Sequence, residues 1–260
     1  MADAVIHPSA IIEPGAEIGP GVSIGPFCVI GPQVRLAAGV ELKSHVVIAG
    51  DTSVGEGTVI FPFASIGQDP QDLKFKGEHT RLEIGARNRI REYVTMNPGT
   101  EGGGGVTRIG DDGLFMANCH VAHDCQIGNR VVLVNSVAVA GHCVLGDDVI
   151  VGGLSGIHQF VRIGRGAMIG ALSMVTADVI PYGLVQGPRA HLDGLNLVGL
   201  KRRGANRAEI AELREVLARL HDGSFRDTAR ELASMDRGAM VGEVLDFILG
   251  PSERSFLKPA

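Results

Sequence analysis

An aliphatic side chain recurs at every sixth position along most of this sequence. The period starts at Ile6, runs unbroken over 6–66, resumes over 84–96, and runs again over 109–175. The fourth residue after each of these anchors is usually small or branched, as at Val22 and Cys28. An antiparallel sandwich would instead show apolar residues in alternation, so the period of six argues against that fold.

Glycine often follows the anchor directly, at Gly19, Gly25, Gly31, Gly128 and Gly164. We attribute these glycines to unusual backbone angles that other residues tolerate poorly. The pattern aliphatic-Gly-x-x-small-x resembles the hexapeptide repeat of left-handed parallel β-helices, in which three hexads make one triangular coil. About 26 hexads then predict a mainly β fold of about nine coils, stacked ~4.8 Å apart. A hexad cannot bury its anchor alone, so stacking supplies the stability.

The composition agrees with such a regular array and excludes several classes. The 260 residues include 37 glycines and no tryptophan, and aromatic residues make up 4%. A net charge of −5 argues against a nucleic-acid-binding protein. No apolar run approaches a transmembrane span and no signal peptide is evident, so we expect a cytoplasmic protein. The cysteines fall on the small interior position, where we expect packed thiols: Cys28, Cys119, Cys125 and Cys143.

The register of the repeat also predicts the domain organisation. Residues 1–187 are expected to form the β-helix, with loop insertions near 68–83 and 99–108 that interrupt the period. The second insertion is glycine-rich and is expected to be mobile. Residues 188–260 are expected to form a small α-helical domain that covers the open end of the coil. Asn206 and Glu209 there resemble a capping box, and two further helices are expected over 225–235 and 239–249.

The densest polar cluster lies at 118–124 and includes His123 and Asp124. One coil is 18 residues, so Gly141 should stack above His123, and Gln159 above Gly141. A histidine suits general-base work at neutral pH, and an adjacent carboxylate can orient its ring. The N–H of Gly141, uncrowded by a side chain, can stabilise an oxyanion. Such groups would suit the attack of a hydroxyl on a thioester, for which no nucleophilic serine or cysteine is required.

These residues resemble the UDP-N-acetylglucosamine O-acyltransferases that begin lipid A synthesis in Gram-negative bacteria. The resemblance covers almost the whole chain, and its most distinctive segments are 24–28, 42–47, 71–74, 89–92, 120–125, 140–142, 158–160 and 199–204. It implies a homotrimer with active sites in the clefts between neighbouring prisms. It further implies a 3-hydroxyacyl donor on acyl carrier protein, the glucosamine 3-hydroxyl of the UDP-sugar as acceptor, and no metal or other cofactor.

The resemblance also implies a role for each site residue. His123 would be the general base, Asp124 its orienting partner and Gly141 the oxyanion donor. The UDP-sugar would be bound by His120, His142, Gln159, Asn196 and Arg203, with Lys74 on the sugar or its phosphate. The acyl donor would meet Gln71, Asp72, His158 and Arg202, and the small Ala171 would admit a moderately long chain.

Two departures from the family pattern and four alternatives remain open from sequence. Val198 replaces an acidic residue of some members, and Asn97-Pro98 replaces a His-Arg pair, which leaves the contacts to uridine open. A zinc-dependent carbonic anhydrase of hexapeptide type would use His120, His123 and His142. The N-acyltransferase of the same pathway would need an N-terminal uridine-binding domain, whereas the hexads here begin at Ile6. A non-catalytic scaffold would not need the His-Asp pair, and a 3-amino sugar remains possible as the acceptor.

Overall fold

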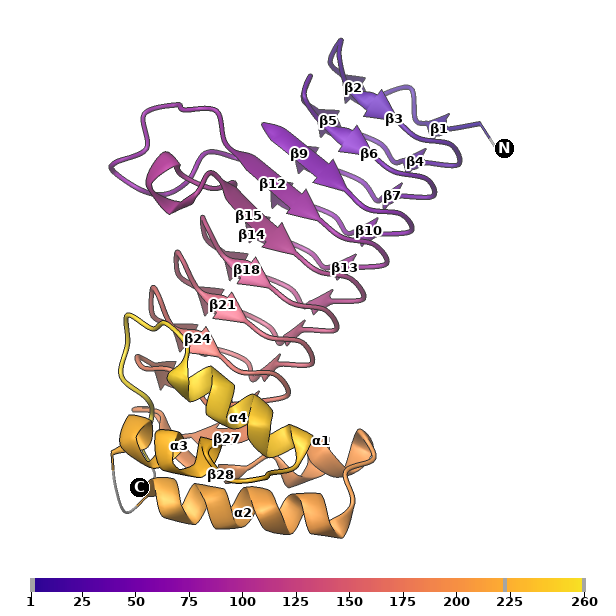
Figure 1. The fold of residues 1–260 in the computed structure, drawn as a ribbon. Helices are drawn as coiled ribbons and strands as arrows, with labels where there is room; N and C mark the ends of the chain where they lie inside the picture. Colours follow the sequence, from indigo (N-terminus) through magenta and orange to yellow (C-terminus); the bar gives the residue numbers. More distant parts are fainter. Residues whose placement is uncertain (1–2, 222–223, 259–260) are drawn as a thin grey trace.

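The computed structural model, which describes residues 3–221 and 224–258, shows a three-sided prism of stacked coils with helices at one end (Figure 1). Each side of the prism is a sheet in which the strands β1–β26 pair in parallel, each with the strand three further along the chain. We call the sides faces A, B and C, in the order in which the chain meets them. Face A holds β1 (Val5–Ile6), β4 (Ser23–Ile24), β7 (Glu41–Leu42), β10 (Val59–Ile60), β13 (Arg89–Ile90), β16 (Leu114–Phe115), β19 (Val132–Leu133), β22 (Ile150–Val151), β25 (Met168–Ile169), β27 (Gly183–Gln186) and β28 (His191–Leu195).

The other two faces complete each coil. Face B holds β2 (Ile11–Ile12), β5 (Val29–Ile30), β8 (Val47–Ile48), β11 (Ser65–Ile66), β14 (Thr95–Met96), β17 (His120–Val121), β20 (Ala138–Val139), β23 (Gly156–Ile157) and β26 (Met174–Val175). Face C holds β3 (Glu17–Ile18), β6 (Arg35–Leu36), β9 (Asp51–Val54), β12 (Arg81–Ile84), β15 (Val106–Ile109), β18 (Gln126–Ile127), β21 (Val144–Leu145) and β24 (Arg162–Ile163).

Every predicted anchor is the last residue of one of the strands β1–β26. From Ile24 onward the anchors are buried, so they form three columns inside the prism. In the first coil Ile6 remains 43% exposed because no further coil covers it. The four cysteines are buried and unpaired, as the small interior position predicts.

The glycines that follow the anchors have a different cause from the one that the sequence suggested. None of Gly19, Gly25, Gly128 and Gly164 has a left-handed backbone. A Cβ at Gly25 would lie 2.8 Å from the Lys43 carbonyl oxygen of the next coil, and one at Gly164 would lie 2.4 Å from Pro181 N. Their role is to let successive coils approach closely.

The left-handed position lies two residues further on, three after the anchor. It is held by glycine in some coils, and by Phe27, His45, Asp124 and His142 in others. Residues 18 apart share a column, so Asp124, His142 and Phe160 lie one above another. Asp124 and His142, two residues of the site described below, therefore have the backbone conformation of the turn that every coil makes at a corner.

The two loops leave the prism at one corner, where face B turns into face C; we call it the B–C corner. The first loop, 67–80, joins β11 to β12, and the second, 97–105, joins β14 to β15. Both are shorter than predicted, because strands β12 and β15 begin at Arg81 and Val106 and pair with each other over four residues. Both loops extend from the same side of the prism in Figure 1.

The chain closes the end of the prism with a hairpin and helices. Strand β28 pairs antiparallel with β27, so residues 191–195 are a strand where a helical segment was predicted. Pairing there covers the last free edge of face A. The helices are α1 (Leu197–Arg202), α2 (Arg207–His221), α3 (Phe225–Ala233) and α4 (Ala239–Leu249).

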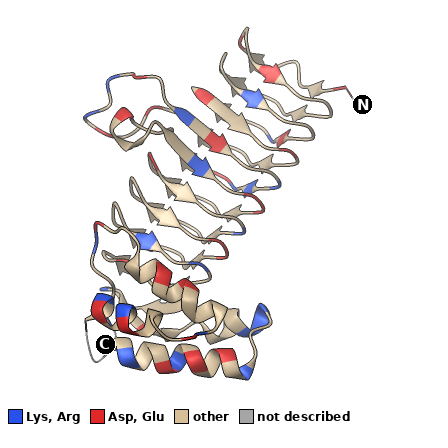
Figure 2. Cartoon of the chain, in the orientation of Figure 1, with Lys and Arg blue, Asp and Glu red and all other residues tan. Residues whose placement is uncertain are grey.

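The capping box at the start of α2 is confirmed. The Glu209 carboxylate accepts the Asn206 N–H at 2.7 Å, and the Asn206 side-chain oxygen accepts the Glu209 N–H at 3.0 Å. No helix within the described residues is long and apolar enough to cross a membrane. In the view of Figure 2, basic and acidic residues are interspersed along the prism and over α2 rather than separated by sign.

Candidate active site

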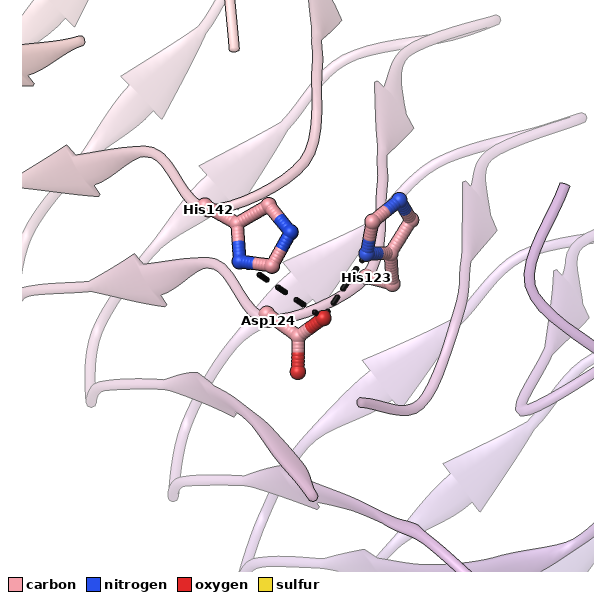
Figure 3. A group of neighbouring side chains, drawn as sticks. All are labelled: His123, Asp124 and His142. Atoms are coloured by element: carbon pink, nitrogen blue, oxygen red, sulfur yellow. Dashed lines mark hydrogen bonds and ion pairs between the residues drawn. The ribbon is translucent and has the colours of Figure 1, made fainter. Parts of the chain in front are cut away.

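His123 and Asp124 form a hydrogen-bonded pair at the B–C corner, in the turn between β17 and β18 (Figure 3). The His123 Nδ1 atom lies 2.7 Å from Asp124 Oδ2. The Asp124 side chain is fully buried, whereas that of His123 is 13% exposed. A buried carboxylate that accepts from Nδ1 leaves Nε2 as the atom able to take a proton from a ligand.

The second loop fixes the Asp124 carboxylate. The Thr100 N–H donates to Oδ1 at 2.8 Å, and the Thr100 hydroxyl donates to Oδ2 at 2.6 Å. A Cβ at Gly103 would lie 2.0 Å from Asp124 Cγ, so only glycine allows the loop to close over the carboxylate. The glycine-rich insertion thus contacts the candidate site directly, and this contact was not predicted.

Gly141 lies on the next coil against the His123 ring, as the 18-residue period predicts. A Cβ there would be 2.6 Å from His123 Cε1 and 2.7 Å from Nε2. Within the described residues the Gly141 N–H makes no hydrogen bond. Early coils carry a residue without an N–H at the equivalent position, at Pro14, Pro20, Pro26 and Pro32. The fold does not need this N–H, so at Gly141 it is available to a ligand.

Two further histidines complete the polar surface. His142 lies edge-on to His123 at 5.0 Å between ring centroids, stacks on Phe160 at 4.4 Å, and places Nδ1 3.8 Å from Asp124 Oδ2. His120 shares a hydrogen bond of 2.7 Å with Thr95 Oγ1. Burial lowers the pKa of both His120 and His142, which favours the neutral form of each ring.

The first loop folds back on this corner. Asp72 Oδ2 lies 4.0 Å from His123 Nε2, and the Asp72 side chain accepts the Lys74 N–H at 3.0 Å. Asp72, Lys74, Asp124 and His142 line one cavity of about 770 Å³. Asn97, which departs from the family pattern, is buried and donates to the Gln68 carbonyl at 2.9 Å, so it holds the base of this loop.

A second cavity, of about 510 Å³, runs from the corner across face B. Its polar part is lined by Gln71, His123, His158 and Gln159 together with the Gly141 backbone near the corner, and by His120 of β17 on the face itself. Along the face its floor is apolar, formed by Ala138, Ala140, Gly156 and Met174. We call this cavity the face B groove. Its polar end and apolar floor suit a ligand with a reactive head and a hydrocarbon chain.

The remaining site residues named from sequence lie elsewhere on the same chain. Asn196, Arg202 and Arg203 line a cavity of about 480 Å³ on face A, together with Ile150 and Met168. Val198, which replaces an acidic residue of some family members, lines the same cavity. One chain therefore does not bring this group to His123.

Some polar atoms of that second group already make hydrogen bonds within the chain. Asn196 caps α1 by accepting the Gly199 N–H at 2.9 Å, and it also donates to the Gly166 carbonyl at 3.0 Å. The buried Nε of Arg203 has no hydrogen-bond partner in the described part of the chain. Ala171 is exposed in the turn between β25 and β26, at the corner between faces A and B.

The possible metal ligands that lie together in the structure differ from those that the zinc hypothesis predicts. Among the described residues, His123, Asp124 and His142 place one ligand atom each within 4.8 Å of one another, and His120 is not in this group. The Asp124 oxygens already accept from Thr100 and lie against His123 Nδ1. This arrangement suits a carboxylate that orients a histidine better than one that binds a metal.

Sequence reasoning missed the residues that support this centre. Thr100 and Gly103 lie in an insertion outside the six-residue register, so no spacing linked them to Asp124. Thr107, whose hydroxyl accepts the Asp124 N–H at 2.7 Å, precedes a strand anchor by two residues and looked like an ordinary interior residue. Arg254 reaches His158 from the far end of the chain.

Comparison with known proteins gives consistent results over the whole length. Residues 178–257 match the family model described as "Udp N-acetylglucosamine O-acyltransferase; Domain 2". Residues 1–38 match the model of the bacterial transferase hexapeptide, six repeats. The crystal structure of a UDP-N-acetylglucosamine acyltransferase superposes with a TM-score of 0.95 at 46% identity, covering 98% of this chain and 99% of that one. The match confirms the predicted left-handed parallel β-helix with a small helical C-terminal part.

Two sequence relatives carry the same name. The acyl-(acyl-carrier-protein)–UDP-N-acetylglucosamine O-acyltransferase of Paracoccus denitrificans is 82% identical over 201 residues, which is 77% of each chain. The protein of that name from Rhizobium leguminosarum is 49% identical and covers 98% of this chain and 95% of its own. The structure of an Arabidopsis UDP-N-acetylglucosamine acyltransferase is 34% identical, with a TM-score of 0.85 over 98% of this chain and 100% of that one. By fold and sequence, this chain belongs to the family of acyl-(acyl-carrier-protein)–UDP-N-acetylglucosamine O-acyltransferases.

Proposed function

We propose that this chain transfers a 3-hydroxyacyl group from acyl carrier protein to the glucosamine 3-hydroxyl of UDP-N-acetylglucosamine, the first step of lipid A synthesis. The observation that carries the proposal is the His123–Asp124 pair beside the unpaired N–H of Gly141. The family membership supplies the identity of the two substrates. We also propose that the reaction takes place in the cytoplasm.

In the proposed reaction the sugar hydroxyl attacks the thioester carbon directly. His123 Nε2 takes the hydroxyl proton while the new C–O bond forms, and Asp124 stabilises the resulting imidazolium. The thioester oxygen becomes an oxyanion that accepts the Gly141 N–H. When the tetrahedral intermediate collapses, the C–S bond breaks and His123 returns the proton to the departing sulfur. No cofactor is required for these steps.

We further propose that the working enzyme is a homotrimer whose sites combine residues of neighbouring chains. The proposal is supported by the separation of the site residues into two groups, one at the B–C corner with His123 and one on face A with Arg203. If both groups contact one substrate, a second copy must present its face A to the corner of the first. The apolar residues Ile150 and Met168 would then form the second wall of the face B groove.

Complementation between inactive chains tests this arrangement. A mixture of His123→Ala and Arg203→Ala chains, denatured and refolded together, is expected to recover activity, because some clefts then combine an intact His123 with an intact Arg203. Each variant refolded alone is expected to remain nearly inactive. The measurement is product formation per milligram against the mixing ratio. A mixture no more active than the sum of its parts would contradict a shared site.

The reaction itself is tested by its product. The purified protein is given UDP-N-acetylglucosamine, its 3-amino analogue and a mixed pool of acyl carrier protein thioesters, and the products are identified by mass spectrometry. An O-acylated UDP-sugar carrying a 3-hydroxyacyl chain is the expected result. An amide product would move the proposal to the amino sugar, and no acyl-sugar would contradict it.

The same donor pool tests the role of Ala171. The Ala171→Met variant is expected to prefer a donor shorter by several methylenes, because the added side chain takes space at the end of face B farthest from His123. Each methylene that loses its apolar contact costs about 0.8 kcal/mol, or roughly fourfold in selectivity. Product masses from wild-type and variant are compared. An unchanged distribution of chain lengths would remove Ala171 from this role.

A further inference from the structure

The segment after α4 returns to the prism and is bound to it by the backbone. The Asp178 N–H donates to the Ser255 carbonyl at 2.7 Å, and the Leu257 N–H donates to the Asp178 carbonyl at 2.8 Å. The Phe256 ring stacks on Phe225 of α3 at 5.5 Å. In Figure 1 this segment lies on the same side of the prism as the two loops. Its position next to the B–C corner is therefore fixed by the fold.

A buried carboxylate sets the conformation of this segment. Asp178 is fully buried and accepts the Arg162 Nε–H at 2.7 Å. It also accepts the Ser252 hydroxyl at 2.6 Å, and the Ser252 oxygen accepts the Arg254 N–H at 3.0 Å. Arg254 is thus held by a series of hydrogen bonds that begins inside the prism.

The Arg254 guanidinium contacts two residues that line the face B groove. Its Nη2 lies 2.7 Å from His158 Nδ1, and its Nε donates to the Gln159 carbonyl at 3.1 Å. A guanidinium can only donate, so His158 Nδ1 accepts this bond, which is much shorter than the 3.3 Å between Nδ1 and the Gln159 carbonyl oxygen. The single ring proton of a neutral His158 is then on Nε2.

We propose that Arg254 is a positioning residue for the reaction: it holds His158 as the Nε2–H tautomer, so that His158 donates a hydrogen bond to an oxygen of the bound acyl thioester. The inference rests on the proposed function. His158 lines the face B groove together with His123, Gly141 and the apolar floor at Ala138 and Gly156. A donor fixed before the ligand arrives binds an oxygen more tightly than one that must first choose a tautomer.

A double-mutant cycle separates this role from a structural one. Arg254→Met is expected to lower kcat/KM for the acyl donor by about tenfold, mainly through KM, with little change in KM for the UDP-sugar. His158→Gln is expected to lower it at least as much. In the His158→Gln background Arg254→Met is expected to have almost no further effect, because Arg254 acts through His158. Arg254→Lys keeps one donor and is expected to stay within about threefold of wild-type.

Arg226→Met is the matched control. Arg226 donates to the Gly250 carbonyl at 3.1 Å at the start of the same segment and does not line the groove. Its kcat/KM should match wild-type, and thermal unfolding of every variant reports on the fold. If Arg254→Met lowers the melting temperature, Arg254→Lys takes its place in the cycle. A loss of kcat/KM for Arg254→Lys that is seen with His158 present and is absent in the His158→Gln background then supports the inference, and an equal loss in both backgrounds contradicts it.

Two results would overturn the inference. One is a loss in the His158→Gln background as large as in wild-type, and the other is an unchanged kcat/KM in Arg254→Met. Wild-type turnover is measured in the same assay, so the absence of wild-type product would count against the proposed function instead.

Discussion

His123→Ala should lower kcat at least ~10²-fold while leaving the fold and the proposed trimer intact. The His123 ring hydrogen-bonds a fixed, buried carboxylate through Nδ1, and within the described residues its Nε2 makes no hydrogen bond. Loss of a general base costs about 10²–10⁴-fold, or at least ~2.7 kcal/mol of barrier. Because His123 is at the surface of the prism and no anchor column depends on it, the stability should change little.

Steady-state kinetics with saturating UDP-sugar and acyl donor measure this effect. His7→Ala is a suitable control, since His7 is exposed in the first coil and, within the described residues, its side chain hydrogen-bonds only to Ser9. The control should retain wild-type turnover. A His123→Ala variant with a near-normal rate would mean that another group takes the proton.

Gly141→Ala should produce a loss of similar size, about 10²-fold in kcat, from one methyl group. The new Cβ would lie 2.6 Å from His123 Cε1 and 2.7 Å from Nε2, well inside van der Waals contact. The ring must turn away from Asp124 or the coil must open, and either change removes the base from its place beside the Gly141 N–H. The Gly141 backbone is not left-handed, so alanine introduces no dihedral strain of its own.

Gly242→Ala in α4 separates this local clash from a general effect of glycine replacement. A Cβ at Gly242 meets no atom within 4 Å, and alanine favours the helix, so its kcat should equal that of wild-type. Equal kcat values for Gly141→Ala and wild-type would show that neither the His123 ring position nor the Gly141 N–H limits the reaction.

The repeat could be predicted from sequence because its cause is local and periodic. Because one side chain in every six must point into the prism, apolar residues recur at every sixth position within each run of the repeat. Each of these residues ends a strand. The same period predicts that Gly141 lies against His123, which the distances confirm. The glycines after the anchors were recognised as part of the repeat, but the explanation given for them was wrong. Close contact between coils and an unusual backbone dihedral both favour glycine, so the sequence alone does not separate the two causes.

Contacts made by segments outside the period could not be predicted. Thr100 reaches Asp124 from an insertion, and Arg254 reaches His158 across 96 residues of sequence. No spacing rule links such residues, because their positions depend on how a loop folds back. The hairpin of β27 and β28 was missed for a related reason: its pairing satisfies the last edge of face A, a need that arises only after the prism exists.

The stacking of Gly141 on His123 makes the geometry of the proposed reaction discrete. The His142 N–H bonds to the His123 carbonyl at 3.0 Å, so the separation between the base and the oxyanion donor is set by one rung of backbone pairing. A side-chain site can drift by fractions of an ångström as its neighbours mutate. Here a slip in register would move the Gly141 N–H by a whole residue. Evolution of this chain can therefore change the residues that bind the substrates far more readily than the spacing between His123 and Gly141.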